Sequence, residues 1–296
     1  MKRQSIVVGV DGSPESASAA SVAWMLARAA DVPCRLVHAA NDVSASLAMA
    51  GTGVVTEALQ LAALAGARGE LRASLPDCVP SAVVDAMVAS TGATADVLEA
   101  VVDETDAAML VLGGKHHSRL GRWLGGSTVQ EMARRLPVPL LVTAGELSIH
   151  PRVMVAVGAS YAALPTIHQA VAFARLLGSP LHALHVIDPP TAIAELPRDW
   201  SREIVERDLW PTIPLVERGK IIREGVPFNT IVDEAAAWRA DVIVVGSHGK
   251  GWVDRWLIGS VTEDLLNNLP CAVLVVPVPK PARRESVAHH SAAAVG

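Results

Sequence analysis

Short apolar runs alternate with longer amphipathic or alanine-rich stretches along most of the chain. The runs with the least polar alternation cover residues 6–10, 35–38, 109–112, 140–142, 153–157, 181–186, 242–245 and 273–276. Continuous apolar runs of this length are typical of strands that are buried on both faces of a parallel sheet. Because the stretches between them have the length of helices, the pattern predicts a doubly wound α/β architecture.

Local signals refine the ends of these expected elements. Ser13 followed by Pro14 predicts the start of the first helix, because serine caps free N–H groups and proline fits the first helical position. Asn229 is the expected N-cap of the next-to-last helix. Residues 220–223, in which a lysine and an arginine bracket two isoleucines, suit a strand at the edge of a sheet.

The whole pattern occurs twice. Two pairs of segments align at an offset of 147: 7–13 with 154–160, and 33–38 with 180–185 (154 − 7 = 180 − 33 = 147). Two further pairs align at an offset of 133: 110–113 with 243–246, and 122–127 with 255–260 (243 − 110 = 255 − 122 = 133). Two constant offsets with one gap predict a tandem duplication whose second copy has lost 147 − 133 = 14 residues between the positions of His38 and Gly92.

The duplication sets the expected domain boundaries. A chain of 296 residues has room for two domains of roughly 100–200 residues each. We place the first copy, half one, at residues 1–144 and the second copy, half two, at 152–277, joined by a linker at 144–152. The remaining segment, 278–296, is rich in proline, alanine, serine and charge, and we expect it to be disordered.

Charge and cysteine content narrow the classes of partner. A formal net charge of −5 lacks the basic footprint of a nucleic-acid-binding protein. The three cysteines, Cys34, Cys78 and Cys271, form no C-x-x-C motif, which indicates reduced thiols rather than a disulfide framework or a zinc site. The N-terminal apolar run ends at Asp11, too early for a signal peptide, and residues 44–67 suit an alanine-rich helix better than a membrane span. We expect a soluble cytoplasmic protein.

A glycine-rich loop follows the expected fourth strand of each copy. In half two, Gly246, Gly249, Gly259 and Ser260 form the pattern G-x-x-G, nine further residues, and G-S at the start of a helix. Glycine lets the backbone approach an anion and adopt φ > 0, and the free N–H groups of a helix N-terminus attract phosphate. The spacing therefore predicts a phosphate-binding loop.

This loop resembles the nucleotide loop of the universal stress protein family, and the likeness covers nearly the whole chain twice. It includes the opening Val-Gly-Val-Asp at 8–11 and the Leu-Val-His at 36–38. The resemblance implies an α/β fold of two tandem Rossmann-like domains. Each domain would be a five-stranded parallel sheet in the order 3-2-1-4-5 with helices on both faces, and the two would pair through their fifth strands as an internal pseudo-dimer. It also implies ATP as the ligand, with or without Mg²⁺.

The resemblance also assigns candidate contacts with the nucleotide. In ATP-binding members, an aspartate that closes strand one contacts the adenosine end, backbone beyond the second strand lines the adenine pocket, and the glycine loop holds the phosphates. The matching positions in half one are Asp11, Ala39, Gly113, His116, Gly126, Ser127 and Thr128. Those in half two are Val186, Gly246, Gly249, Gly259 and Ser260.

Each half departs from the family pattern at one position. His116 replaces the second loop glycine of half one, and Gly158 replaces the strand-one aspartate in half two. A histidine at φ > 0 costs about 1–3 kcal/mol, and one lost charge-assisted hydrogen bond costs about 1.5–3 kcal/mol. The two losses are similar, and the extra Gly114 with nearby basic residues favours half one slightly. Whether one half, both or neither binds ATP stays open.

Several candidate residues also have ordinary structural interpretations. Asp11 could cap the first helix, although an acid at the carboxyl end of strand one favours a ligand role. His38 and His185, at equivalent strand ends, are best interpreted as structural. The loop histidines have no carboxylate or cysteine at ligand spacing, so no metal site is expected. No catalytic residue is expected either, because the sequence contains no Walker A loop, nucleophile elbow or catalytic triad.

The sequence thus favours an ATP-binding stress-response or signalling regulator that is not an enzyme, with any ATP hydrolysis slow. One alternative is a degenerate scaffold of the same fold that binds no nucleotide. A less favoured alternative is a slow ATPase or a nucleotidyl-transfer enzyme. The expected partners are an adenine nucleotide and an unspecified protein. Neither nucleic acid nor a membrane is expected as a partner, and a further homodimer stays open beside the internal pseudo-dimer.

Overall fold

A computed structural model describes residues 4–40, 57–114, 127–160, 162–188, 202–213, 219–247 and 258–277. The described strands of half one are β1 Ile6–Gly9, β2 Cys34–Ala40, β3 Val88–Thr91, β4 Met109–Gly113 and β5 Leu140–Thr143. Its helices are α1 Pro14–Ala30, α3 Glu57–Ser74, α4 Ser81–Asp85, α5 Thr94–Glu104 and α6 Ser127–Arg135.

Half two follows the same order of elements. Its strands are β6 Val153–Val157, β7 Leu181–Ile187, β8 Lys220–Glu224, β9 Val242–Gly246 and β10 Ala272–Val276. Its α-helices are α7 Ala163–Leu176, α9 Pro227–Trp238 and α10 Ser260–Asn267. A short π-helix, Val205–Leu209, and a 3-10 turn, Trp210–Thr212, lie between β7 and β8.

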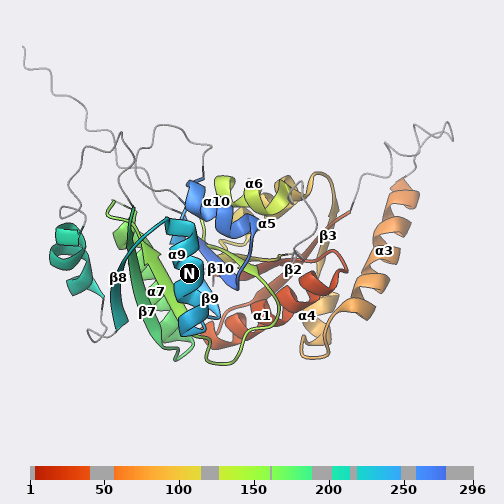
Figure 1. The fold of residues 1–296 in the computed structure, drawn as a ribbon. Coiled ribbons are helices and arrows are strands. Elements are labelled where there is room, and N and C mark those ends of the chain that lie inside the picture. The colour runs from red at the N-terminus through yellow and green to blue at the C-terminus, as the bar shows by residue number, and fades with distance from the viewer. Residues whose placement is uncertain are drawn as a thin grey trace, which may run out of the picture.

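One ten-stranded sheet runs through both halves, in the order β3-β2-β1-β4-β5-β10-β9-β6-β7-β8 (Figure 1). All neighbours within a half are parallel, while β5 and β10 pair antiparallel. Each half therefore has the predicted order 3-2-1-4-5, and the fifth strands join them as a pseudo-dimer. Leu141 pairs with Leu274, and 274 − 141 = 133, so this pair of equivalent residues marks the pseudo-twofold axis.

Helices cover both faces of the sheet, and each face has one core that spans both halves. Successive strand residues point to opposite faces, so Val7 and Val8 enter different cores. Residues of α1, α4 and α7 fill the first core, and residues of α5, α6, α9 and α10 fill the second. Full burial of a large aliphatic side chain contributes about 1.5–3 kcal/mol, so the shared cores bind the two halves together strongly.

The duplication is also visible in the backbone conformation. Three pairs of equivalent residues adopt positive φ: Asp31 (52°) and Gly178 (59°), Gly92 (142°) and Gly225 (151°), and Asp106 (47°) and Arg239 (56°). Their offsets are 178 − 31 = 147 and 225 − 92 = 239 − 106 = 133, as in the sequence alignment. The sequence types differ within two of these pairs, so the turn geometry has been kept where the residue has changed.

Most predicted elements are confirmed, with two differences. The Ser13 side chain caps α1 by accepting a hydrogen bond from the Ser16 N–H at 3.2 Å, and β8 lies at the sheet edge as expected. The expected cap Asn229 is wrong, because α9 begins at Pro227 with Val226 in an extended conformation before it. Strand β3 was not predicted, since its four residues include a serine and a threonine and none is fully buried.

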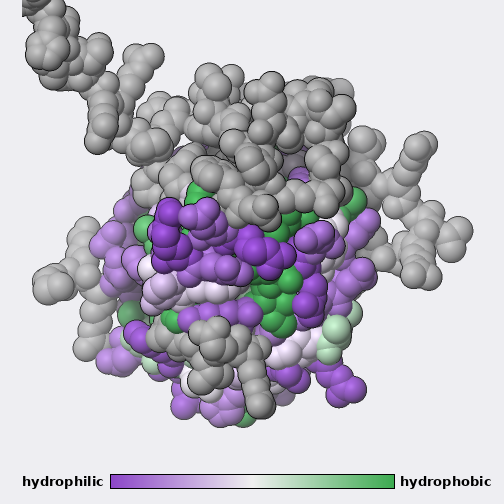
Figure 2. Space-filling model, turned by 60° about the vertical axis from the view of Figure 1, so that its left-hand side comes forward, coloured by the Kyte–Doolittle hydropathy of each residue, from purple (hydrophilic) through white to green (hydrophobic). Residues whose placement is uncertain are grey.

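The expectations for the alanine-rich helix at 44–67 and for the segment 278–296 can be tested only in part. The predicted alanine-rich helix is present from Glu57 onward as α3, while residues 44–56 and the segment 278–296 lie outside the described residues. No helix in the described part of the chain is long and apolar enough to span a bilayer. Seen from the side of half two, hydrophilic side chains dominate the part of the surface drawn in colour, and hydrophobic ones form a strip near its centre and a few smaller spots (Figure 2).

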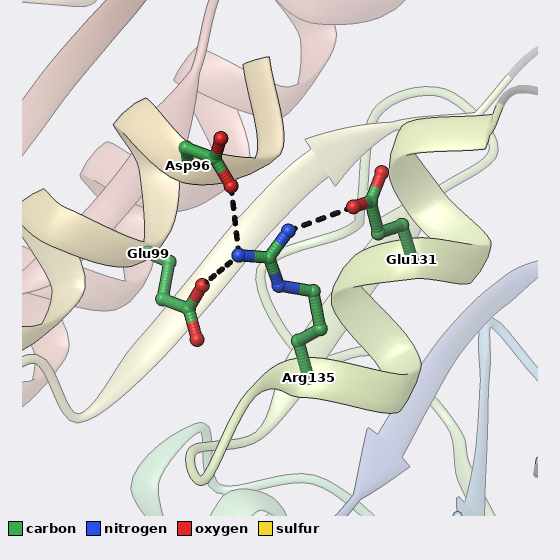
Figure 3. Close-up of polar contacts among 4 residues, drawn as sticks. All are labelled: Asp96, Glu99, Glu131 and Arg135. Atoms are coloured by element: carbon green, nitrogen blue, oxygen red, sulfur yellow. Dashed lines mark hydrogen bonds and ion pairs between the residues drawn. The ribbon is translucent and has the colours of Figure 1, made fainter. Parts of the chain in front are cut away.

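A cluster of charged residues fastens α5 to α6 in half one (Figure 3). The Arg135 guanidinium donates to Asp96 at 2.8 Å, to Glu131 at 2.7 Å and to Glu99. These hydrogen bonds, the one to Asp96 first, raise the pKa of Arg135 above its ordinary value. Because Arg135 ends the helix that Ser127 begins, the cluster sets the position of the helix that follows the loop of half one.

Two polar contacts join α6 to α10 across the pseudo-twofold axis. Arg134 forms an ion pair with Glu263 at 3.2 Å, and the Gln130 amide donates to the Asn267 side-chain oxygen at 2.6 Å. Since 263 − 130 = 267 − 134 = 133, the two contacts occupy equivalent places. One is charged and the other is neutral, so the duplicated interface has diverged.

Candidate functional site

A cavity of about 450 Å³ opens at the carboxyl ends of the central strands of half two. Its lining comes from the ends of β6, β7 and β9, from the start of α9 and from the first turn of α10. Strand β6 lies between β7 and β9, which is where the strand order reverses. Ligands of open α/β sheets bind at this topological switch point, and the volume falls within the range of roughly 300–1,000 Å³ that small-molecule sites occupy.

One side of the cavity is formed by the glycine-serine segment that begins α10. The helix starts at Ser260 after Gly259, and its N-terminus has no side-chain cap. The Gly259 N–H donates to the Ser247 carbonyl at 2.9 Å, and the Thr262 hydroxyl donates to the Gly246 carbonyl at 2.8 Å. These bonds fix the first turn of the helix against β9, so its N–H groups are presented to the cavity in the arrangement that attracts anions.

Apolar side chains form much of the remaining lining. Val186 on β7, Pro227 and Ile231 on α9, and Val245 on β9 all contribute to the wall. A surface of this kind suits the flat face of a nucleobase, which is largely apolar above and below its ring plane. The cavity thus combines an apolar wall with a site for a negative charge.

Two residues at the strand ends differ in what they offer a ligand in the cavity: one has no side chain and the other has a carboxylate. Gly158 lines the cavity after β6, and a Cβ atom there would meet only the Ser160 hydroxyl at 3.9 Å. Asp188 follows β7 directly, lines the same cavity and is exposed. Sequence reasoning missed Asp188, although its place two residues beyond the predicted contact Val186 was a usable signal.

The two strand-end histidines have the structural role that was expected of them. Nδ1 of His38 donates to the Val10 carbonyl at 2.8 Å, and Nδ1 of His185 donates to the Val157 carbonyl at 2.7 Å. Each bond ties the end of strand one to the end of strand two within its half. In half two, this bond fixes the backbone on which Gly158 enters the cavity wall.

Asp11 of half one is exposed and closes the turn that leads into α1. One of its carboxylate oxygens accepts hydrogen bonds from the Ser13 N–H at 3.0 Å and from the Ser13 hydroxyl at 2.5 Å. Gly12, between them, has a φ of 83°. Asp11 therefore orients the capping residue Ser13 and does not cap α1 itself, and its contact with a ligand stays a prediction.

The two glycines at the end of β4, Gly113 and Gly114, are explained by packing. A Cβ on Gly113 would lie 2.5 Å from the backbone carbonyl of Glu15, and one on Gly114 would lie 2.1 Å from a methyl group of Leu269 in half two. Gly113, Gly246 and Gly259 are not among the described residues with positive φ, so the expectation of φ > 0 is wrong for them. Close approach of neighbouring backbone and side chains is the reason at Gly113 and Gly114.

The other predicted site residues differ in how far the structure places them. Ser127 begins α6, and Thr128 follows it, half-buried, in the first turn. Ala39 is half-buried on β2 and packs against the second core. His116, Gly126 and Gly249 lie outside the described residues. The structure therefore brings together Val186, Gly246, Gly259 and Ser260 in one cavity.

Comparison with known proteins decides the family. The model of the universal stress protein family matches residues 2–144 and, a second time, residues 150–277. The chain belongs to the universal stress protein family. It is 28% identical over 305 residues to a universal stress protein of Mycobacterium tuberculosis, covering 93% of this chain and 97% of that protein. A universal stress protein of Mycolicibacterium smegmatis is 27% identical over 292 residues, with 92% and 96% covered.

Solved structures show the same fold for the tandem chain. A universal stress protein from Archaeoglobus fulgidus matches with a TM-score of 0.60 at 17% identity, covering 94% of this chain and 99% of that one. A putative universal stress protein from Pseudomonas aeruginosa matches with a TM-score of 0.59 at 18% identity, covering 93% of each chain. This universal stress protein therefore shares its two-domain arrangement with relatives over nearly their full length.

Two of the three cysteines of this universal stress protein have thiols that are largely withdrawn from solvent. Burial raises the pKa of the Cys34 and Cys271 thiols to about 12, so both remain protonated and unreactive at neutral pH. Within the described ranges, no group of three or more histidine, cysteine, aspartate or glutamate side chains is placed to hold a metal ion. The chemistry that the cavity of half two offers is recognition of an apolar ring and an anion.

Proposed function

We propose that half two of this universal stress protein binds an adenine nucleotide, with ATP as the ligand, and that the protein acts as a nucleotide-dependent regulator in stress response or signalling. The observation that carries the proposal is the cavity of about 450 Å³ bordered by the uncapped N-terminus of α10. The phosphates would lie at the Gly259–Ser260 turn, and the base would lie against the wall that contains Val186 and Ile231.

Because of this cavity, we prefer half two to half one as the proposed nucleotide site. The sequence favoured half one slightly because it has an additional glycine, Gly114, and nearby basic residues. In the structure, Gly114 packs against Leu269, which gives this glycine a structural reason. The basic residues at 115, 119 and 122 lie outside the described residues, and Asp11, which half one retains, also closes the turn into α1.

A binding protein without rapid turnover fits this arrangement. Hydrolysis of ATP needs a positioned water or general base. Among the described residues that line the cavity, the candidate bases are His185, whose Nδ1 is engaged by the Val157 carbonyl, and the exposed Asp188, so we expect any hydrolysis to be slow. A bound nucleotide would act by stabilising one conformation, and the contact of α10 with α6 through Glu263 and Arg134 gives it a route to half one.

The first test is the nucleotide content and the ATP stoichiometry of the purified full chain. The protein is denatured, its supernatant is chromatographed, and the stripped protein is titrated with ATP by calorimetry. We expect one ATP per chain. Release of no nucleotide together with no heat of binding would reject the proposal and support the non-binding scaffold.

A pair of substitutions at Gly259 locates the site. Gly259→Asp and Gly259→Asn both supply a side-chain cap to α10, so both should preserve or raise its stability. The aspartate also places a negative charge where the phosphates would lie, so it should weaken ATP binding by at least about tenfold relative to the asparagine variant. Asp11→Ala is the matched change in half one. If it abolishes binding while Gly259→Asp does not, half one holds the site.

A further inference from the structure

The cavity of half two contains one carboxylate that no motif assigns. Among the described residues that line it, Asp188 is the single acidic side chain. It is exposed and lies immediately beyond the last residue of β7. The described residues give it no hydrogen bond or ion pair, so its oxygens are available to accept hydrogen bonds from a ligand.

The two halves carry an acidic residue after different strands: half one after strand one, and half two after strand two. At the end of strand one, half one has Asp11 and half two has Gly158 (158 − 11 = 147). Beyond the end of strand two, half one has Asn41 and half two has Asp188 (188 − 41 = 147). In half two these strands are neighbours, since Val157 on β6 pairs with His185 on β7. Gly158 and Asp188 therefore reach the same cavity from adjacent strands.

We propose that Asp188 is the carboxylate that recognises the ribose in half two and so replaces the acid absent at Gly158; this inference rests on the proposed binding of an adenine nucleotide. A ribonucleotide presents two neighbouring hydroxyl donors, and an ionised carboxylate has two oxygens that accept them together. The absence of a side chain at Gly158, where a Cβ would meet only the Ser160 hydroxyl at 3.9 Å, leaves room for the sugar beside Asp188.

Ribose recognition by Asp188 has a measurable consequence for ligand choice. The wild-type site should prefer ATP to 2′,3′-dideoxy-ATP, because the dideoxy sugar leaves the carboxylate without donors. Asp188→Ala should weaken ATP binding by roughly tenfold or more and should leave the affinity for 2′,3′-dideoxy-ATP nearly unchanged. The preference between the two nucleotides would then disappear.

The experiment measures both nucleotides by calorimetry on the full chain, with Asp11→Ala as a common background so that half one does not contribute. Asp233→Ala is the matched control, because Asp233 is an exposed acid on α9 that does not line the cavity, and its affinities should equal those of the background protein. Asp188→Ala combined with Gly158→Asp returns a carboxylate on the adjacent strand end and should recover much of the lost ATP affinity.

The outcomes separate the two proposals. If the background protein binds ATP and Asp188→Ala binds it equally well, the role of Asp188 is refuted and the nucleotide site stands. If Asp188→Ala weakens ATP and 2′,3′-dideoxy-ATP to the same degree, ribose recognition is likewise refuted. If neither the background nor the wild-type chain binds ATP, the proposed function itself fails, and the role of Asp188 fails with it.

Discussion

The two halves share one backbone plan but hold their last helices in different ways. In half one, Arg135 ties α6 to carboxylates on α5 and on α6 itself (Figure 3). The positions in half two equivalent to Asp96, Glu99, Glu131 and Arg135 are Asn229, Val232, Asp264 and Asn268, each 133 residues further on. Half two thus lacks this ion cluster, and the start of its corresponding helix borders a cavity that the described residues form. The sheet and its turns are alike in the two halves, whereas the ion cluster that holds α6 in half one has no counterpart in the sequence of half two.

Close packing across the halves gives the largest expected effect. Gly114→Ala should destabilise the protein by about 1–3 kcal/mol, because the new methyl group would overlap Leu269 and Val142. The equivalent position in half two is Ser247, so only half one demands the absence of a side chain here. Unfolding in urea, followed by circular dichroism, measures the change.

The control for this substitution has the opposite expected sign. Gly69 on α3 is exposed and has nothing within 4 Å of a new Cβ. Gly69→Ala should therefore raise stability by about 0.5–1 kcal/mol through helix propensity alone. A Gly114→Ala protein as stable as the wild type would show that Leu269 does not pack closely over this glycine.

Replacement of Arg135 tests whether the ion cluster distinguishes the halves. Arg135→Asn copies the residue of half two and leaves Asp96, Glu99 and Glu131 facing one another without a cation. We expect the melting temperature to fall by roughly a few degrees, and by less at high salt, because salt screens these partly exposed charges. The reciprocal Asn268→Arg should change little, since only Asp264 is available as a partner. Equal effects of the two substitutions would contradict the difference between the halves.

Half two contains a buried histidine whose protonation opposes folding. His182 is 5% exposed, stacks on Trp238 with 4.7 Å between ring centroids, and has Glu234, Arg223 and Arg152 around it. Burial lowers its pKa below the ordinary 6.5, with the two arginines acting in the same direction and Glu234 against it. The unfolded chain therefore binds a proton that the folded chain does not, and stability is lost as the pH falls below about 6.5.

The position equivalent to His182 in half one is Arg35, which does not titrate in this range (182 − 35 = 147). His182→Leu should therefore flatten the decline in stability between about pH 7 and pH 5, as measured by urea unfolding at each pH. A decline of unchanged steepness in that variant would assign the acid sensitivity to other groups.

The contact between Arg134 and Glu263 gives the smallest expected effect. Both side chains are partly exposed, so a double-mutant cycle with alanine should yield a coupling energy of about 0.2–1 kcal/mol. The neutral contact of Gln130 with Asn267 is the matched cycle on the other side of the axis. Only the charged contact should weaken as salt is added, and a cycle insensitive to salt would contradict an ionic contribution.

The fold was largely predictable because its strands are short, apolar and buried on both faces. β6 was predicted with its observed bounds, since all five of its residues are apolar and four of them are fully buried. β3 escaped prediction because an edge strand needs no continuous apolar run, and its residues are only partly buried. Asn229 was a misleading cap, since Pro227 can begin a helix without its own N–H and Val226 already has extended geometry.

The site was predictable only in part. The G-x-x-G, nine-residue, G-S spacing identified Gly246, Gly259 and Ser260, because all three belong to one loop and the helix that follows it. The structure places them in the cavity lining. The spacing did not reveal the packing of Gly114, whose neighbour Leu269 lies 155 residues further along the chain (269 − 114 = 155). The place of Asp188 in the cavity could not be predicted from the sequence, because five separate elements contribute residues to the cavity lining.

The antiparallel contact between β5 and β10 forms within one chain, because a covalent linker joins the two halves. Two separate subunits joined by these strands would dissociate on dilution, whereas the linker between Thr143 and Val153 keeps each half at a high effective concentration for the other. The unfolding midpoint should therefore not depend on protein concentration. Because the two halves are covalently joined, one cannot be replaced by a second copy of the other. Each chain therefore always presents one half of each kind to a binding partner.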